Sequence, residues 1–346
     1  MADINEGTPM RSGERWSQLY SNPNVYCIEV PFTNISTDET NVFVIEDEGE
    51  FLVVDTGAPT DEGAAVFERA LDEIGVDRSK ASFFLTHLHM DHAGLVDRSV
   101  PLDAPLYVSG TDFYLMNLSK EPHFWEHAEA RVMAEGVSAE NARTFCRVGR
   151  YGTGIDSFKA DGRNLVFPDE GDEIKVGRHV FEVIDTAGHT PGHMSLLHRE
   201  SGLFFGGDHV LFVISPGLGF RPDGGDPMAT YLSNVRKMFD LGITRLLVAH
   251  GELKDGWEER ARWAIAHHER RLALAVDVVR ANPGATGEEV IRGLKWNVPM
   301  DWDDVSTVQK WCIIESGIII LEHQVREGLI VREKDAQGVY RYTVAA

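Results

Sequence analysis

The chain has 346 residues, enough for one large domain of about 250 residues and a smaller appendage. Hydrophobic residues make up 43% and charged residues 25%, which is typical of a soluble globular protein and excludes a fibrous or disordered chain. The formal net charge of −22, from 33 basic and 55 acidic residues, disfavours nucleic acid and anionic membrane surfaces as partners.

The cysteines and the N-terminus indicate a cytoplasmic protein. The three cysteines are Cys27, Cys146 and Cys312. Because they are odd in number and far apart, they predict neither a disulfide framework nor a CxxC metal clip. Residues 1–6 lack the basic region and apolar stretch of a signal peptide. The apolar run Ile313–Leu321 is too short to span a bilayer, so we expect no membrane association.

Five short apolar segments each lead to a histidine or an aspartate, with glycine close by. Such runs predict strands that are buried on one or both faces. The polar residue after each strand would lie at a sheet edge, where ligands usually bind. The pairs are Phe51–Val54 before Asp55, Ser82–Leu85 before His87, Val180–Ile184 before His189, Leu203–Phe205 before Asp208, and Leu246–Val248 before His250.

Helical patterns between these segments favour an α/β fold. Residues Asp61–Ile74 and Met228–Phe239 carry apolar side chains at helical spacing. The region Val25–Ile45 predicts an antiparallel contribution. An insertion at about 112–150 is mostly helical and rich in aromatic residues. It is predicted to be either a lid over the site or a helical pair packed on the sheet, and the sequence leaves both open.

After His250 the pattern changes to helices followed by a hairpin. The expected helices are Trp257–Arg280, one that begins at a capping box of Thr286 and Glu289, and one near Thr307–Glu327. Residues Gly328–Arg332 and Val339–Tyr342 predict the hairpin. We therefore predict a catalytic domain of residues 1–255 and a winged-helix-like domain of residues 256–346.

The strongest chemical signal is the run Thr86-His87-Leu88-His89-Met90-Asp91-His92. In an extended chain, residues two apart point to the same side, so we expect His87, His89 and Asp91 to face one cavity. His92 would address a neighbouring position. Imidazole and carboxylate groups suit Zn²⁺ or Fe²⁺ and accept Mn²⁺. Such a run beside a buried strand favours a metal site over a polar surface loop.

Four further motifs accompany this run in order: Val54-Asp55-Thr56-Gly57, Ala187–His193, Gly206-Gly207-Asp208 and Ala249-His250-Gly251. The set resembles the metallo-β-lactamase superfamily. The resemblance implies an αββα sandwich with two metals at one edge of the paired sheets. It implies that His87, His89 and His189 hold the first metal, that Asp91, His92 and His250 hold the second, and that Asp208 bridges both.

The resemblance also implies roles around the metals. Asp55 would support the site by orienting a ligand imidazole through its other N–H. His193 would fix its loop by hydrogen bonding, and Ser195 would be structural. Asp91 would be both a metal ligand and the catalytic residue that receives or passes on a proton. The cofactors would be two divalent ions, with Zn as the first choice and Fe or Mn as alternatives.

Two such metals would ionise a shared water near neutral pH, and the hydroxide would attack the substrate. Asp208, where β-lactamases of this fold generally carry Cys, points to thioesterases, lactonases and nucleases. We expect hydrolysis of a small acyl ester, either a thioester or a lactone. The aromatic insertion favours an apolar acyl group.

Three alternatives remain open at this stage. A mononuclear iron persulfide dioxygenase would use only the first-site residues. A single-stranded RNA endonuclease fits the similarity of the C-terminal segment to the lactamase-β-2-like subgroup, although this segment lacks a basic stripe. A non-catalytic binding protein is disfavoured, because such a protein would not need a complete set of metal ligands. The sequence also leaves a homodimer open.

Overall fold

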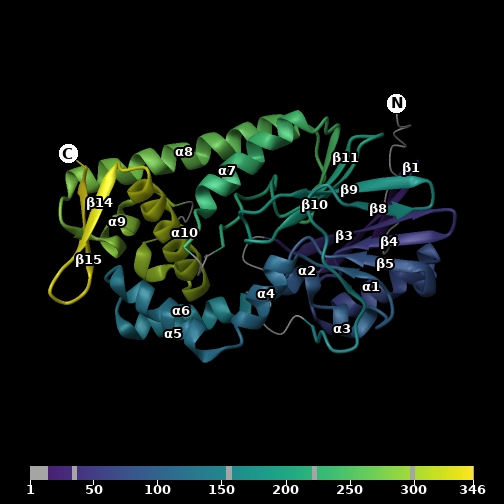
Figure 1. The fold of residues 1–346 in the computed structure, drawn as a ribbon, viewed down its shortest axis with the longest axis horizontal. Helices are drawn as coiled ribbons and strands as arrows, with labels where there is room; N and C mark the ends of the chain where they lie inside the picture. Colours follow the sequence, from purple (N-terminus) through teal and green to yellow (C-terminus); the bar gives the residue numbers. More distant parts are fainter. Residues whose placement is uncertain (1–14, 33–36, 153–157, 220–223, 297–300, 346) are drawn as a thin grey trace.

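The structure is a computed structural model that describes residues 15–32, 37–152, 158–219, 224–296 and 301–345. Residues 1–6, considered above for a signal peptide, lie outside this part. Figure 1 shows two β-sheets at one end of an elongated molecule and a group of helices with a small hairpin at the other. None of the helices described combines the length and apolar character needed to cross a membrane.

The first sheet has seven strands in the order β1 to β7. They are β1 Trp16–Ser21, β2 Asn24–Pro31, β3 Glu39–Asp47, β4 Glu50–Val54, β5 Ala81–Phe84, β6 Leu106–Tyr107 and β7 Leu165–Val166. Strands β1 to β4 pair antiparallel, and β4 to β7 pair parallel. Because β4 and β5 are parallel, the residues that follow them emerge at the same edge of the sheet.

The second sheet has five strands in the order β12-β11-β10-β9-β8. They are β8 Glu173–Val176, β9 His179–Asp185, β10 Met194–His198, β11 Leu203–Gly207 and β12 Arg245–Val248. Strands β11 and β12 are parallel, and the remaining pairs are antiparallel. The five predicted strands are therefore confirmed, with bounds that differ by one or two residues.

The two sheets pack face to face, and helices cover their outer faces. Phe43 and Leu52 of the first sheet meet Phe181 and Phe205 of the second in a shared apolar core. Helix α1, Asp61–Ile74, covers the outer face of the first sheet. Helices α7, Pro227–Lys237, and α8, Trp257–Ala281, cover the second. The predicted αββα layering is confirmed.

Helix α1 shows why the predicted helices form where they do. The side chain of Thr60 accepts a hydrogen bond from the Gly63 N–H at the N-terminus, and Gly75 ends the helix at φ 87°. Phe67 and Leu71 lie one turn apart and are fully buried against the sheet. Burying two such side chains contributes about 4 kcal/mol.

Short helices complete the first half of the chain. They are the 3₁₀ turn η1 Arg78–Lys80, α2 Met90–Ala93 and α3 Val96–Ser99. The insertion forms α4 Gly110–Leu118, α5 Pro122–Ala134 and α6 Ala139–Gly152. Val132 and Phe145 of α5 and α6 share an apolar core with the C-terminal segment, to which Ile314 and Ile318 also belong. The insertion therefore joins the sandwich to the C-terminal helices, an arrangement that neither prediction for it described.

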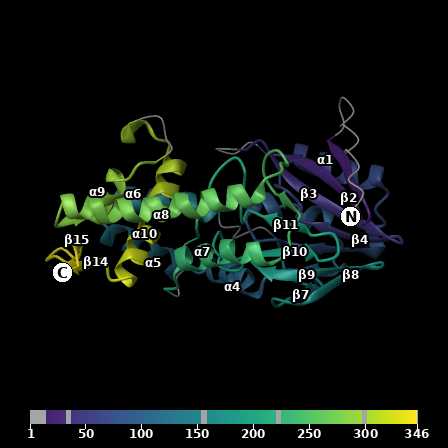
Figure 2. The same cartoon turned by 90° about the horizontal axis from the view of Figure 1, so that it is seen from above.

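The C-terminal segment has the predicted elements. Its helices are α8, α9 Gly287–Gly293 and α10 Thr307–Arg326, with the 3₁₀ turn η3 Trp302–Asp304 before α10. The 3₁₀ turn η2 Met238–Asp240 precedes this segment, between α7 and β12. The capping box of Thr286 and Glu289 is present. Strands β13 Ala285–Thr286, β14 Ile330–Lys334 and β15 Tyr340–Val344 form a three-stranded sheet in the order β13-β15-β14. Figure 2 shows α8 running from the sandwich to this sheet. The winged-helix assignment and the domain division stay predictions.

Candidate metal centre

The Thr86–His92 run leaves β5 as a loop and turns into α2 at Met90. His89 is the N-cap of this short helix, with φ −67° and ψ 153°. The prediction of an extended backbone through Asp91 is therefore wrong. Because Asp91 and His92 lie in a helical turn, they reach a position different from that of His87 and His89.

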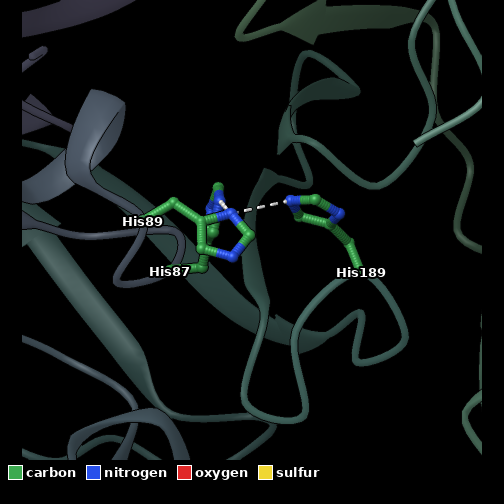
Figure 3. A group of neighbouring side chains, drawn as sticks. All are labelled: His87, His89 and His189. Carbon is green, nitrogen blue, oxygen red and sulfur yellow. Dashed lines mark hydrogen bonds between the residues drawn. The ribbon is translucent and has the colours of Figure 1, made fainter. Parts of the chain in front are cut away.

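Three histidines form a first cluster (Figure 3). His89 Nδ1 lies 2.9 Å from His87 Nε2 and 3.1 Å from His189 Nε2. These separations are close to the roughly 3.3 Å between two nitrogens that each bind one Zn²⁺ at about 2.0 Å. The loop after β5 delivers the first two side chains, and the loop after β9 delivers His189. The cluster therefore has the donor set and spacing of a metal site.

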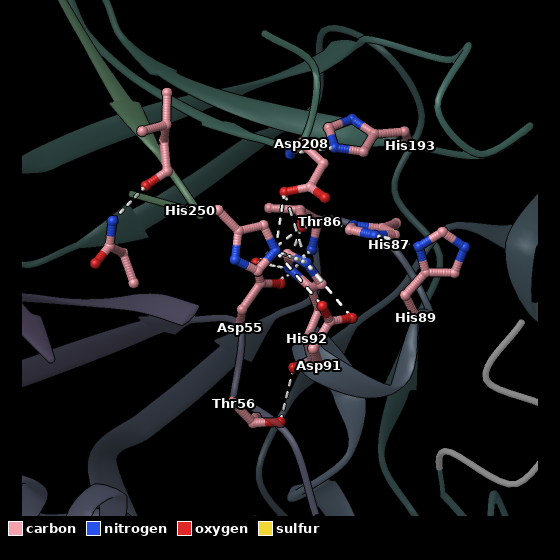
Figure 4. Close-up of polar contacts among 12 residues, drawn as sticks. Asp55, Thr56, Thr86, His87, His89, Asp91, His92, His193, Asp208 and His250 are labelled. Carbon is pink, nitrogen blue, oxygen red and sulfur yellow. Dashed lines mark hydrogen bonds and ion pairs between the residues drawn. The ribbon is translucent and has the colours of Figure 1, made fainter. Parts of the chain in front are cut away.

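Asp91, His92 and His250 form a second cluster beside the first (Figure 4). His92 Nε2 lies 3.2 Å from His250 Nε2, and Asp91 Oδ2 lies 3.5 Å from the same His250 nitrogen. His250 reaches the cluster from the end of β12, across the interface between the two sheets. Segments far apart in the sequence thus converge here.

Asp208, at the end of β11, lies between the two clusters (Figure 4). Its Oδ2 is 3.5 Å from His189 Nε2 in the first cluster. Its Oδ1 is 3.6 Å from His92 Nε2 and 3.5 Å from His250 Nε2 in the second. Asp208 Oδ1 is buried and has no hydrogen-bond partner among the described residues. An unpaired buried carboxylate oxygen is costly unless a cation satisfies it, so this residue fits a metal ion.

Asp55 connects the second cluster to the first sheet. Its Oδ2 lies 2.8 Å from His92 Nδ1, on the opposite side of the ring from the cluster. It also accepts hydrogen bonds from the backbone N–H and the hydroxyl of Thr86. This geometry is the one that orients a ligand imidazole through its other nitrogen. The metal-supporting role of Asp55 remains a prediction.

Backbone carbonyls orient the imidazoles of two candidate ligands. His250 Nδ1 lies 2.8 Å from the Glu39 carbonyl oxygen, and His189 Nδ1 lies 2.6 Å from that of Gly217. Since a carbonyl only accepts, each ring carries its proton on Nδ1 and turns an unprotonated Nε2 toward the cluster.

His193 fixes its loop by hydrogen bonding, as predicted. Its Nδ1 lies 2.7 Å from Thr186 Oγ1, and its Nε2 accepts a hydrogen bond from the Asp208 N–H. Ser195 is fully buried against Thr186, which agrees with a structural role. Gly207 must be glycine because its φ is 50° and a Cβ would come within 2.7 Å of His193 Nε2.

The electrostatics of the site favour a bound cation. Burial and the neighbouring histidines hold the pKa of His87 well below its usual range, and the same causes lower the pKa of His89 to about 3. These imidazoles are neutral and can donate to a metal. Burial disfavours the charged form of His92, yet surrounding carboxylates, Asp55 first, raise its pKa to about 10. The carboxylates therefore stabilise positive charge at this position.

Comparison with known proteins agrees with this geometry. The family model described as the metallo-beta-lactamase superfamily matches residues 36–250, well over half of the chain. The chain belongs to the metallo-beta-lactamase superfamily. Its fold is similar to that of a metallo-beta-lactamase family protein from Thermus thermophilus, with TM-score 0.73 at 22% identity over 92% of this chain and 98% of that one.

This superfamily member has low sequence identity to its known relatives. It is 25% identical to the probable metallo-hydrolase YqjP of Bacillus subtilis, over 66% of this chain and 72% of the relative. It is 23% identical to a beta-lactamase-like protein 2 homolog of Caenorhabditis elegans, over 75% and 71%. It is 26% identical to the hydroxyacylglutathione hydrolase GloC of Haemophilus influenzae, over 62% and 87%. The His/Asp clusters and these likenesses make the chain a candidate metallo-hydrolase.

One buried carboxylate that sequence analysis missed ties two ligand loops of this superfamily member together. Asp112, in the first turn of α4, accepts hydrogen bonds from Thr190 Oγ1 at 2.7 Å and from the Gly192 N–H at 2.6 Å. A backbone hydrogen bond from Leu88 reaches the same carboxylate. Thr190 follows His189, and Leu88 lies between His87 and His89. No motif signalled Asp112, because it lies in the insertion and its partners are remote in sequence.

Helix α8 supports the site from the C-terminal side, which sequence analysis also missed. Arg260 donates hydrogen bonds to the carbonyls of Leu211 and Ile214, and His268 Nε2 lies 3.1 Å from Ser215 Oγ. These contacts hold the loop after β11 that contains Gly217, whose carbonyl orients His189. A helix outside the family match thereby positions a candidate ligand.

The aromatic residues of the insertion pack mainly inside the protein. Phe113 packs against the core of the first sheet, and Trp125 is buried and donates a hydrogen bond to the Ser119 carbonyl. Tyr114, at 63% exposed, lies on the surface. These side chains have structural explanations, so the expected apolar acyl pocket gains no support from Phe113 or Trp125.

Proposed function

We propose that the protein is a dinuclear metallo-hydrolase that cleaves a small acyl ester, either a thioester or a lactone. The observation that carries the proposal is the position of Asp208, whose two oxygens face two different clusters of candidate ligands. The likeness to a hydroxyacylglutathione hydrolase supports a thioester, because that relative is named for hydrolysis of an acylglutathione.

In the proposed site, His87, His89 and His189 would hold the first ion, and Asp91, His92 and His250 would hold the second. Asp208 would be shared by both. When bound, two divalent ions supply an ionised water at neutral pH and polarise the carbonyl oxygen of the substrate. The chain's own contribution is rigid placement: Asp55, Glu39 and Gly217 each hold one ligand imidazole in its orientation.

Asp91 is the proposed proton-transfer residue. Its side chain is 15% exposed, more than Asp208 at 9% or His92 at 0%, so it is the ligand carboxylate with the greatest access to solvent. A carboxylate that is near both the second cluster and water can take a proton from the attacking water and return it to the leaving group.

Substitution of Asp91 by Asn tests this role. An amide keeps the shape and one oxygen ligand but cannot accept the proton, so we expect kcat to fall by about 10²–10⁴-fold. Metal content, measured by elemental analysis, should fall far less than activity. An Asp91→Asn enzyme with near-normal kcat would contradict the proton-transfer role, and Asp240→Asn on the surface is the matched control.

The function itself is tested by elemental analysis of the purified protein together with a panel of thioesters, lactones and single-stranded RNA. We expect two metal ions per chain at the candidate metal centre and turnover of a thioester or lactone that a chelator abolishes and added metal restores. One iron per chain and no second metal would favour a persulfide dioxygenase instead. Cleavage of RNA with salt-sensitive binding would favour the nuclease. Full activity after metal removal would refute the proposal.

A further inference from the structure

A second group of potential metal ligands lies at the opposite end of the strands from the candidate metal centre. His179 begins β9 and His198 ends β10, whereas the loop that joins the other ends of these strands carries His189 and His193. A strand of five residues spans roughly 16 Å, so the two groups are separate. Glu200 lies in the turn that follows β10, and its carboxylate is within 4.8 Å of the nearest ligand atoms of both histidines.

The two imidazoles meet as they do in the candidate metal centre. His179 Nδ1 lies 3.1 Å from His198 Nε2, a separation that matches the 2.9–3.2 Å between ring nitrogens of the candidate ligands. Both side chains are more than nine-tenths buried, at 6% and 3% exposed. This separation is also close to the roughly 3.3 Å between two nitrogens that bind one tetrahedral metal ion at about 2.0 Å.

The outward nitrogens of both rings face oxygen atoms. His198 Nδ1 lies 2.7 Å from Ser201 Oγ. His179 Nε2 is buried without a hydrogen-bond partner and lies 3.9 Å from Asp47 Oδ1. Histidines that bind metals characteristically direct their second nitrogen at an oxygen atom, as His198 does at Ser201.

Local charge is compatible with a cation. Arg178 is paired with Asp47, and Arg199 is paired with Glu182, so neither guanidinium is left unbalanced near the histidines.

We propose that His179, His198 and Glu200 form a separate site for one divalent transition-metal ion, with Zn²⁺ as the physiological candidate. The donor set of two imidazoles and one carboxylate suits Zn²⁺, Cu²⁺ and Ni²⁺ and disfavours Ca²⁺ and Mg²⁺. An ion here ties the start of β9 to the end of β10 and stabilises that end of the sandwich, because it binds only the folded chain.

The test is equilibrium dialysis of the full chain against Zn²⁺, followed by elemental analysis. We expect His198→Gln to bind one ion per chain fewer than the wild type, whereas His267→Gln, a half-buried histidine on α8, binds as many as the wild type. Equal stoichiometry in wild type and His198→Gln would overturn the proposal and leave a simple hydrogen bond between two imidazoles.

Two further experiments test the same site independently. Glu200 is exposed, so Glu200→Gln should fold normally. Because it removes a charged ligand, it should weaken binding of this one ion by at least about 10-fold, the lower end of what the loss of an outer hydrogen bond costs; unchanged affinity would also overturn the proposal. In an Asp208→Ala background, one Zn²⁺ should remain and disappear on adding His198→Gln. This difference does not depend on how many ions the candidate metal centre holds, so failure of the proposed function would be distinguishable.

Discussion

Asp208 is a carboxylate that interacts with histidines of both clusters of the candidate metal centre. Burial disfavours its charge, but His250, His92 and His189 hold the pKa of this carboxyl well below its usual range. It is therefore ionised at neutral pH. One anionic oxygen faces each cluster, which makes this residue the natural shared ligand of two cations.

We expect Asp208→Ala to lose metal and activity together, because the substitution removes a ligand from both ions. The fall in metal affinity should exceed the roughly 100-fold that the loss of an outer hydrogen bond costs. Elemental analysis after dialysis measures it, with Asp240→Ala, exposed on η2, as the control. Two metals retained at the candidate metal centre of Asp208→Ala would count heavily against the bridging role.

Asp112 acts on the same centre without contacting it. Its carboxylate holds the loop of His189 through Thr190 and Gly192 and the loop of His89 through Leu88. We expect Asp112→Ala to weaken metal binding by about 10–100-fold, as other losses of orienting hydrogen bonds do. Asp112→Asn, which keeps an acceptor for the Gly192 N–H, should restore most of the affinity.

A metal titration followed by calorimetry measures this effect, and circular dichroism checks the fold. Asp103→Ala serves as a control of the same chemistry, because Asp103 is an exposed aspartate seven residues before the start of α4. Unchanged metal affinity in Asp112→Ala would show that the two loops keep their positions without this carboxylate.

At the scale of elements, α8 couples the C-terminal segment to the metal centre. Its Arg260 holds two carbonyls of the loop between β11 and α7, and its His268 contacts Ser215 of the same loop. The loop in turn presents the Gly217 carbonyl to His189. The C-terminal segment is thus part of the support of the site, whatever other role it has.

We expect Arg260→Met to weaken binding of the first metal by several-fold, since the aliphatic stem stays packed while the donors to the loop are lost. Arg262→Met is the matched control, because Arg262 lies on the same helix and packs over Phe239 instead. The test compares the metal affinities of the two variants by competition with a chelating dye. Equal metal affinities would show that the loop keeps its position without the hydrogen bonds from Arg260.

At the scale of the whole molecule, the insertion and the C-terminal segment are joined around a buried carboxylate. Glu135, at the end of α5, accepts a hydrogen bond from the Tyr342 hydroxyl of β15 and lies 3.5 Å from Arg332 of β14. Burial raises the pKa of this carboxyl to about 7, although Tyr342 and Arg332 act in the opposite direction. The junction therefore contains a group that titrates near neutral pH.

This raised pKa makes the stability of the junction depend on pH. Between the ordinary value near 4.5 and about 7, the folded chain binds more protons at Glu135 than the unfolded chain does. The contribution of Glu135 to the free energy of unfolding is therefore largest below pH 4.5 and is lost as the pH rises to 7. Glu135→Gln should remove this dependence and be more stable than the wild type at pH 8, by on the order of 3 kcal/mol.

Urea unfolding of both proteins at several pH values between 5 and 8 gives the difference in free energy directly. Glu121→Gln, at the other end of α5, is the control, because this glutamate is exposed. A difference between Glu135→Gln and the wild type that stays constant over this pH range would contradict the prediction.

Much of the site could be predicted from sequence because its signals are local. An apolar strand followed by a polar residue, as in β4 before Asp55 or β11 before Asp208, combines a burial pattern with a chemical group within a few positions. The helices α1 and α9 were predicted for the same reason, and α9 was predicted with its capping box, since Thr286 lies beside the residues it caps.

Other features were decided only by the tertiary structure. The change from loop to helix at Met90 depends on packing of α2 against the Asp55 loop, where Thr56 hydrogen-bonds to the His92 carbonyl. Asp112 and Arg260 act through partners about 80 and 50 positions away, and the carbonyls that orient His189 and His250 come from backbone of any sequence. Hydrogen bonds between remote segments leave no periodic pattern in a single chain, so only the folded arrangement reveals them.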